Sequence, residues 1–430
     1  MENEMAKLPL QRKLRRTGSK LANTIASKGK QNMIILIALF ALILIFYAVN
    51  PNFLSKYNIL SMTQSLAPYA ILALGVTFVI ATGGIDLSIG TVCIAASVIA
   101  GHFYTKGMPL WLTIPMMIVI GGLFGLLNGF LVAKLKLPAF IATLGTMMLS
   151  RGLSAIIVSV PNIFYPTGTW FNKTFSNLND FPIGIVWVIV FMLLCMYLMY
   201  KNKIGRYILS IGSNEEATRL SGINTDKYKM IAYVFTGLGA GIAAIFWSAS
   251  FATVAAATGN GMELDAIAGV YIGGTSAAGG VASVAGSVIG SLMLVVIRSG
   301  LNFVLAILDL NVNATYVTYV LTGVIVVVSV LMDIIKTKNA AKVKIETPLE
   351  KGKRQYRERH ANLQTEIDMA YTDGTLYAPE REAKVQALLK EDEELKAEFR
   401  KKKVELKAET ARLKAEMEKA KSETKNNNRF

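Results

Sequence analysis

The chain has 430 residues, of which 53% are hydrophobic and 17% charged, and its formal net charge is +16. Its apolar residues come in long runs, such as the 17 uncharged residues 33–49, a length close to the shortest helix that crosses a bilayer core of about 30 Å. A set of soluble domains is therefore excluded in favour of one membrane domain. The two cysteines and the two histidines are isolated, so the pattern predicts neither a disulfide framework nor a metal site.

Positive charge collects at both ends of the chain. Residues 1–32 carry eight Lys or Arg against two acids, and residues 336–430 carry 24 against 18. Basic segments can bind nucleic acid, but beside a membrane domain they are typical of cytoplasmic flanks. We therefore predict a basic cytoplasmic segment over 1–32, a membrane domain over 33–335 and a cytoplasmic tail over 336–430, with no nucleic-acid partner.

The apolar runs predict an all-α polytopic membrane protein with about ten transmembrane helices. The run 33–49 follows a basic lead that is too long for a secretory signal, so it is expected to remain as the first span. Lys and Arg are more frequent in the predicted inner loops than in the outer loops, which indicates that both termini are cytoplasmic. The expected spans lie near 33–49, 62–81, 85–104, 110–132, 138–159, 183–200, 229–254, 264–279, 284–304 and 314–334. The eighth is short and rich in glycine, and a broken or re-entrant helix is the alternative to a full span there.

Two glycine-rich stretches, 83–90 and 273–290, interrupt this pattern. Small residues let membrane helices pack closely, whereas paired Gly-broken segments in two halves of a transporter also indicate a translocation path, and both alternatives stay open. The predicted helix breaks are Gly83, Gly84, Gly273 and Gly274. The polar candidates for lining the path are Thr82, Asp86, Ser88, Asp265, Thr275 and Ser276.

Asp86 places a carboxylate in an apolar stretch, although a charge at the centre of a span costs about 3 kcal/mol on insertion scales. Because Asp86 follows Gly-Gly at a helix start, we expect it to cap the third predicted span, where the helix dipole favours negative charge. Direct contact with a transported solute and pairing with another polar group are the alternatives. Arg151 and Arg298 also fall within spans, and each is expected near a span end or beside a carboxylate.

The loop 201–228 is the most polar stretch of the predicted membrane domain and contains the signal of a short helix. A cap, two acids for the first turn and a terminating glycine follow one another at the right spacing. These residues are Ser213 or Asn214, Glu215 and Glu216, and Gly222. A helix of about two turns is marginal alone in water, so we expect it to pack against a partner; a solvated connector is the alternative.

The largest predicted outer loop, 160–182, is rich in aromatic residues. Such residues are typical of the membrane interface. A docking surface for an external partner is the alternative.

Four stretches carry recognisable patterns. They are "LGVTFVIATGGIDLSIGTV" (74–92), "LPAFIATLGTMMLSRGL" (137–153), "GRYILSIGSNEEATRLSGIN" (205–224) and "ELDAIAGVYIGGTSAAGGVASVAGSVIGSLM" (263–293). Together they resemble the membrane permease subunits of ribose-type ABC sugar importers, in that family's order and over roughly residues 33–335. Gly269, Tyr271 and the missing glycine near Ala282 depart from the pattern, which bears on packing or substrate choice.

The resemblance implies a non-catalytic permease subunit that pairs with a second copy of itself in the cell inner membrane. It implies a coupling helix at the surface of a separate ATP-binding subunit, and an extracytoplasmic sugar-binding protein as a further partner. The chain contains no G-x-x-x-x-G-K-[ST] phosphate loop, so ATP and Mg²⁺ are expected in that partner and no cofactor here. The residues implied for coupling are Ser213, Asn214, Glu215, Glu216, Ala217, Arg219 and Gly222.

The tail departs from this family, whose permeases usually end soon after the last span. Residues 387–423 are rich in Ala, Glu, Lys and Leu and lack Gly and Pro, which predicts a helix. Its thin apolar seam is Leu395, Phe399, Leu406, Leu413, Met417 and Ala420, interrupted by Lys402, Glu409 and Glu416. A weak coiled coil or a helix packed on a partner, a lone charged helix and disorder are the alternatives. The basic stretch 336–359 is expected either at the anionic inner leaflet or simply as the stop after the last span.

The expected function is import of a pentose or hexose driven by ATP hydrolysis in another chain. Permeases for nucleosides or other small polar solutes are the nearest alternative. An ion-coupled secondary transporter and a membrane scaffold whose tail is the active part are the alternatives from other classes.

Overall fold

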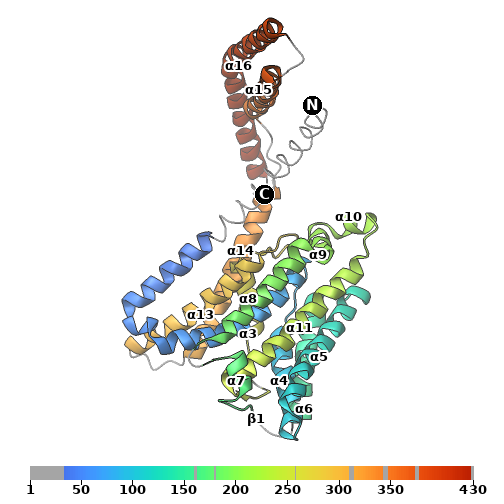
Figure 1. The fold of residues 1–430 in the computed structure, drawn as a ribbon, viewed down its shortest axis with the longest axis vertical. Helices are drawn as coiled ribbons and strands as arrows, with labels where there is room; N and C mark the ends of the chain where they lie inside the picture. The colour runs from blue at the N-terminus through green and yellow to red at the C-terminus, as the bar shows by residue number, and fades with distance from the viewer. Residues whose placement is uncertain are drawn as a thin grey trace. The chain divides into compact units, whose positions relative to one another are not determined.

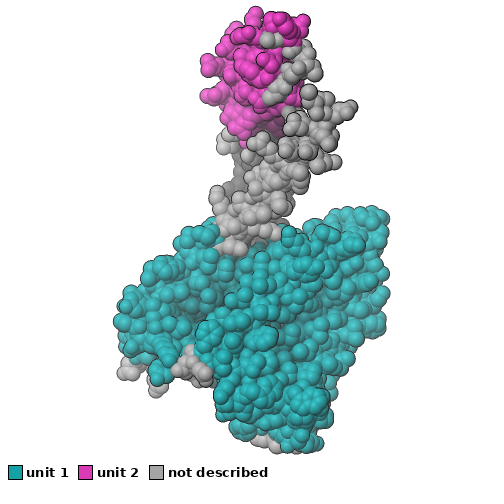
Figure 2. Space-filling model, in the orientation of Figure 1, with its two compact units in different colours: residues 1–339 teal, residues 340–430 magenta. Residues whose placement is uncertain are grey.

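The computed structural model describes residues 33–158, 162–178, 181–256, 258–308, 314–341, 347–372 and 377–427. The predicted basic segment 1–32 lies outside these residues. The chain divides into two units, Met1–Asn339 and Ala340–Phe430, which Figure 2 shows in different colours. Each unit is described by itself.

The first unit is a bundle of helices (Figure 1). In chain order its elements are a helix over Met33–Val49, η1 (Pro51–Leu54), α3 (Lys56–Ala81), α4 (Ile89–Thr105), α5 (Leu110–Gly129), η2 (Phe130–Lys134), α6 (Ala139–Ile157), β1 (Ile163–Phe164), α7 (Trp170–Phe175), α8 (Ile183–Met196), η3 (Tyr197–Lys201), α9 (Lys203–Ser213), α10 (Glu215–Leu220), α11 (Thr225–Phe251), β2 (Thr253–Val254), α12 (Met262–Ile272), α13 (Val284–Ile307) and α14 (Ala314–Ala341). The strands β1 and β2 pair antiparallel, with Ile163 opposite Val254.

Six helices of the described chain are long and apolar enough to cross a membrane. They span Lys56–Ala81, Leu110–Lys134, Ala139–Ile157, Ile183–Lys201, Thr225–Phe251 and Val284–Ile307. The helix over Met33–Val49 and α4 are apolar but shorter. The fold is thus the all-α polytopic membrane fold that the sequence predicted.

The helices α3 and α11 form the centre of this bundle. In the most apolar window of α3, 83% of the residues are buried, whereas in that of α5 only 22% are. The outer helices instead expose large apolar side chains, including Val119, Leu123 and Val190. Exposure of apolar side chains is favourable where a helix faces lipid, because lipid tails are as apolar as the side chains.

Glycines set the closest helix contacts. A Cβ on Gly121 of α5 would lie 2.3 Å from the carbonyl oxygen of Gly237 on α11, and one on Gly290 of α13 would lie 2.0 Å from that of Gly269 on α12. These contacts are the small-residue packing that brings membrane helices together. Gly269, one of the departures from the family pattern, is therefore part of the contact between α12 and α13.

The boundaries of three predicted spans differ from the structure by several residues. The helix α4 begins at Ile89 rather than at residue 85, because the chain first makes a turn around Asp86. The helix α12 ends at Ile272, and the residues that follow, 273–283, form turns rather than the second half of a span over 264–279. The second span is longer than predicted, since α3 begins at Lys56 after the capping side chain of Ser55.

The aromatic loop contributes partly to the core. Tyr165 and Phe171 are buried, and the Tyr165 hydroxyl donates a hydrogen bond to the carbonyl of Ser97 (2.6 Å). Phe164, Trp170 and Phe181 are exposed. The buried pair explains part of the loop's aromatic content by packing, whereas the exposed residues fit either predicted alternative.

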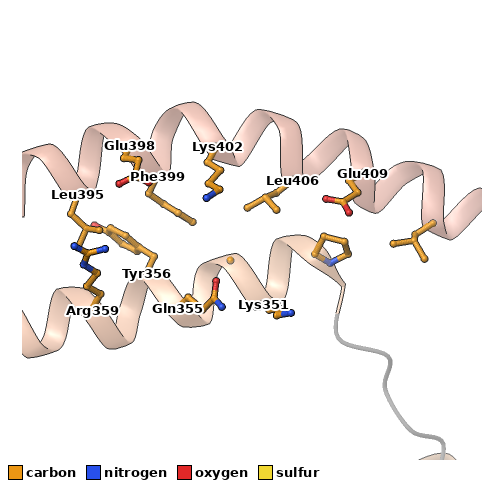
Figure 3. A pocket seen from close by; sticks show the side chains of 13 residues that line it. Lys351, Gln355, Tyr356, Arg359, Leu395, Glu398, Phe399, Lys402, Leu406 and Glu409 are labelled. Carbon is orange, nitrogen blue, oxygen red and sulfur yellow. The ribbon is translucent and has the colours of Figure 1, made fainter.

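The second unit is an antiparallel pair of helices, α15 (Pro348–Thr372) and α16 (Ala378–Asn427). The ring of Tyr356 stacks on Phe399 (4.3 Å between centroids), and the backbone N–H of Leu349 donates to the Thr410 hydroxyl (3.1 Å). The predicted helix over 387–423 thus lies within α16, and its partner is another helix of the same chain. A groove of about 590 Å³ lies between the two helices. Figure 3 shows Lys402 and Glu409 beside Leu406 along this groove.

Candidate functional site

The short helix α10 carries most of the residues predicted to couple to an ATPase. The Asn214 side chain caps it by accepting a hydrogen bond from the Ala217 N–H (2.9 Å). Glu215 and Glu216 occupy the first turn, where the helix dipole favours acids. The chain turns away after the helix at Gly222, whose φ of 81° suits glycine. In Figure 1, α10 lies at one end of the bundle, and α7 and β1 lie at the other.

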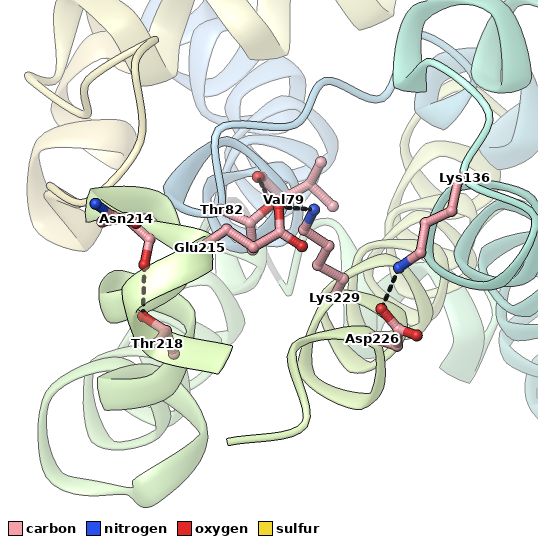
Figure 4. Close-up of polar contacts among 8 residues, drawn as sticks. All are labelled: Val79, Thr82, Lys136, Asn214, Glu215, Thr218, Asp226 and Lys229. Atoms are coloured by element: carbon pink, nitrogen blue, oxygen red, sulfur yellow. Dashed lines mark hydrogen bonds and ion pairs between the residues drawn. The ribbon is translucent and has the colours of Figure 1, made fainter. Parts of the chain in front are cut away.

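Polar contacts hold α10 to its neighbours (Figure 4). Glu215 forms an ion pair with Lys229 of α11 (2.6 Å). The hydroxyls of Ser210 on α9 and Thr218 on α10 share a hydrogen bond (2.8 Å). The helix is therefore anchored on two sides rather than attached only through its ends.

The outer surface of α10 is open to solvent. Leu220 is 83% exposed, and Glu216, Ala217 and Arg219 are exposed as well. An exposed leucine with charged neighbours of both signs fits a protein partner better than bulk water. These four residues of α10 are thus accessible to a partner protein.

A cavity of about 420 Å³ lies between α10 and the first helix break. Thr82, Gly83 and Gly84 line it from the break, and Glu215 and Arg219 line it from α10. Its other charged residues are Lys136, which pairs with Asp226, and Lys229. The cavity therefore brings together residues that the sequence placed in two separate predicted sites.

Three segments distant in the chain meet at what we call the glycine junction, formed by Ala81, Gly83, Gly212, Gly279 and Gly280. The N–H of Gly280 donates to the Ala81 carbonyl at the end of α3 (3.0 Å). A Cβ on Gly212 would lie 2.0 Å from that same oxygen and 2.3 Å from the Gly280 nitrogen. A Cβ on Gly279 would lie 2.7 Å from the Gly83 nitrogen. The first helix break, the loop after α12 and the end of α9 are thus in backbone contact.

Asp86 belongs to a buried polar cluster just after the first break in the chain. Its Oδ1 accepts hydrogen bonds from the N–H (2.9 Å) and the hydroxyl (2.7 Å) of Ser88. The amide of Asn128, on α5, donates to the Ser88 hydroxyl (2.8 Å) and points toward both carboxylate oxygens of Asp86 at 3.4 and 3.5 Å. The N-cap position of α4 is Ser88 and not Asp86, so the predicted cap is wrong. Asp86 instead closes a local turn two residues earlier.

The other path candidates lie in different surroundings. Asp265 forms an ion pair with Arg298, as expected for an arginine inside a span. The Thr275 hydroxyl accepts from the Ser283 N–H (3.0 Å), and the Ser276 hydroxyl accepts from the Ala278 N–H (3.3 Å). Asp86 with Ser88, Asp265, and Thr275 with Ser276 thus make different polar contacts. Among the described residues, no three His, Cys, Asp or Glu side chains are grouped as a metal site requires.

Several residues of these clusters were not predicted from the sequence. Asn128 and Tyr233 are polar side chains within apolar spans, which was a signal in the sequence, and the Tyr233 hydroxyl donates to the Ile85 carbonyl (3.2 Å). Gly212 carried no such signal, because its contacts come only from distant segments. Lys229 stands at the start of a span, where a lysine is ordinary.

Comparison with known proteins identifies the family. The family model described as "Branched-chain amino acid transport system / permease component" matches residues 58–330. The ribose import permease of Escherichia coli K12 is 36% identical over 310 residues, which cover 69% of this chain and 92% of that protein. A fructose import permease of Bifidobacterium longum is 35% identical (64% and 76% covered), and the xylose transport permease of E. coli K12 is 30% identical (71% and 92%). No solved structure matches. The chain therefore belongs to the family of ABC transporter permease components that includes the ribose, fructose and xylose import permeases.

Proposed function

We propose that this chain is the membrane permease subunit of an ATP-driven importer that carries a sugar, a pentose or a hexose, across the cytoplasmic membrane. The observation that carries the proposal is the 36% identity to a ribose import permease over 92% of that protein's length. Permeases of this family are non-catalytic subunits. ATP and Mg²⁺ therefore belong to a separate ATP-binding subunit.

The chain crosses the membrane about ten times, with α12 and the turns after it counted as one crossing, and both termini lie in the cytoplasm. An even number of crossings puts both termini on the same side of the membrane. The excess of Lys and Arg in the predicted inner loops supports the cytoplasmic side. In this arrangement α10 lies at the cytoplasmic end of the bundle and faces the ATP-binding subunit. The aromatic loop with α7 lies at the outer end, where a sugar-binding protein delivers its cargo.

Coupling to ATP hydrolysis runs through α10. Its exposed residues, Glu216, Ala217, Arg219 and Leu220, meet the ATP-binding subunit, while Glu215 and Thr218 hold the helix to α11 and α9. The cavity beside it offers room for the helix to move toward the break at Gly83 and Gly84. Access to the path then alternates between the two sides of the membrane. A second copy of the permease completes the path, and lipid covers the exposed apolar helices.

Asp86 shapes this path rather than contacting the sugar. Asp86 is 1% exposed, and its carboxylate is engaged by Ser88 and Asn128. A carboxylate buried in this way is out of reach of a passing hydroxyl group.

Reconstitution tests the proposal. The permease, an ATP-binding subunit and a sugar-binding protein encoded beside it are placed in proteoliposomes, and uptake of ribose, fructose and xylose is measured. We expect uptake of at least one sugar that requires ATP and the binding protein. Uptake driven by an ion gradient without ATP would overturn the proposal, and uptake of nucleosides but no sugar would assign the alternative substrate.

A further inference from the structure

We propose that Gly212 is a positioning residue that passes each displacement of α10 to the first helix break and to the loop after α12 at the same time. This inference rests on the proposed function, because it assumes that α10 is moved by an ATP-binding subunit. It adds a physical route from that helix to the first break, 81–84, and to residues 278–280 of that loop. The route consists of backbone contacts at the glycine junction.

The first step is from α10 to Gly212. Only Ser213 and the capping residue Asn214 separate Gly212 from α10. The hydrogen bond between Ser210 and Thr218 (2.8 Å) ties α10 to the last turn of α9, which contains Gly212. A displacement of α10 is therefore expected to carry the end of α9 with it rather than bend a flexible loop.

The second step is from Gly212 to the end of α3 and to the loop after α12. The Ala81 carbonyl is one of the last carbonyls of α3, which a helix leaves without an internal partner, and the Gly280 N–H satisfies it (3.0 Å). Gly212 packs against this hydrogen bond, because its missing Cβ would fall within 2.3 Å of both atoms. The obstacles are backbone atoms, which cannot swing aside as a side chain can. A shift of α9 therefore moves the end of α3 and the loop after α12 together.

Glycine at this position has no local explanation. Gly212 lies inside α9 and does not have a positive φ, so its backbone conformation is open to any residue. Glycine within a helix costs about 1 kcal/mol relative to alanine. The contact with Ala81 and Gly280 accounts for its presence.

The test replaces Gly212 in the complete complex of permease, ATP-binding subunit and binding protein. Gly145→Ala is the matched control, because Gly145 lies inside α6 and no other atom would come within 4 Å of its Cβ. We expect Gly212→Ala complexes to assemble and hydrolyse ATP, but to take up about tenfold less sugar per ATP, a change within the range that coupled networks show. Gly145→Ala should match the parent. An assembled Gly212→Ala complex with the parent's uptake per ATP overturns the proposal.

A second measurement uses the unaltered complex and tests the inference even if the Gly212→Ala complex fails to assemble. Amide hydrogen exchange is compared between the nucleotide-free complex and the complex held with ATP and vanadate. We expect exchange to change together in residues 209–222, 81–84 and 276–283. A change confined to 209–222 overturns the inference. If the parent complex takes up no sugar with ATP, the proposed function fails instead, so the two failures are distinguishable.

Discussion

Asp265 on α12 forms an ion pair with Arg298 on α13 in the interior of the membrane unit. Thr322 of α14 donates to the other carboxylate oxygen (3.1 Å), and Arg298 donates to the Tyr69 hydroxyl of α3 (3.0 Å). The guanidinium carbon also lies 5.1 Å from the centre of the Tyr69 ring. One charge pair thus connects four helices.

Replacing Arg298 by methionine should destabilise the membrane unit by about 3–5 kcal/mol, because it leaves the Asp265 carboxylate buried without its cation. The double variant Asp265→Asn/Arg298→Met should recover most of this loss, since no net charge is then buried. Denaturant unfolding in mixed micelles measures both. If the double variant were as unstable as Arg298→Met alone, the charge would not be the cause.

Replacing Gly237 by valine should separate α11 from α5. A Cβ at Gly237 would lie 2.3 Å from the Gly121 carbonyl oxygen and 2.7 Å from Gly125 atoms. Overpacking of this kind costs about 1–3 kcal/mol, and more where the obstacle is backbone. The unfolding midpoint in detergent should fall for Gly237→Val and stay near the parent's for Gly145→Val, whose side chain meets open space. Equal loss in both variants would point to the β-branched side chain rather than to the contact.

Asp86→Ala should destabilise the protein by about 1–3 kcal/mol, because the Ser88 N–H and the Asn128 amide lose a buried acceptor. Asp86→Asn keeps an oxygen in the place of Oδ1 and should cost less. Neither variant should raise the KM for sugar uptake, since the carboxylate serves the turn and not the substrate. A raised KM in an Asp86→Asn protein of unchanged stability would place Asp86 in contact with the sugar.

The contrast between Asp86 and Gly212 shows what the sequence could predict. Helix ends depend on nearby residues, so the interruptions at 83–84 and 273–274, and a short helix after Asn214, could be read locally. The role of Asp86 could not, because Asn128 comes from another helix and Ser88 occupies the N-cap position of α4. Gly212 was missed for the same reason, since Ala81 and Gly280 are distant in the chain. The sequence also could not predict which helix packs against α16, because its interrupted apolar seam is compatible with several partners.

The contact between α15 and α16 should weaken in acid. Burial raises the pKa of Asp392, but the hydrogen bonds and charges of Lys396 and His360 outweigh it and hold the pKa of this carboxyl below its usual 3.8. A carboxyl whose pKa is lower in the folded state gives stability that is fully present above its unfolded pKa and is lost as pH falls through the folded pKa. Protection of α15 amides against hydrogen exchange in the full chain should therefore fall below about pH 4, relative to amides of α11.

The variant Asp392→Asn is the control for this acid effect. Its amide keeps an acceptor for Gln364, which donates to Asp392 at 3.1 Å, but it has no charge to lose. Protection of α15 in this variant should be lower than the parent's at neutral pH and should change little with acid. A parent and a variant that lose protection in parallel would show that another group titrates.

Deletion of residues 347–430 should leave sugar uptake intact. The family match ends at residue 330, and the ribose permease is matched over 92% of its length. The tail also forms its own unit, in which α15 and α16 pack against each other, with Tyr356 stacked on Phe399. ATP-dependent uptake by the truncated and full-length complexes, at equal amounts of assembled permease, makes the comparison. Because assembly is measured separately, loss of uptake by a truncated complex that still assembles would show that the tail takes part in transport itself.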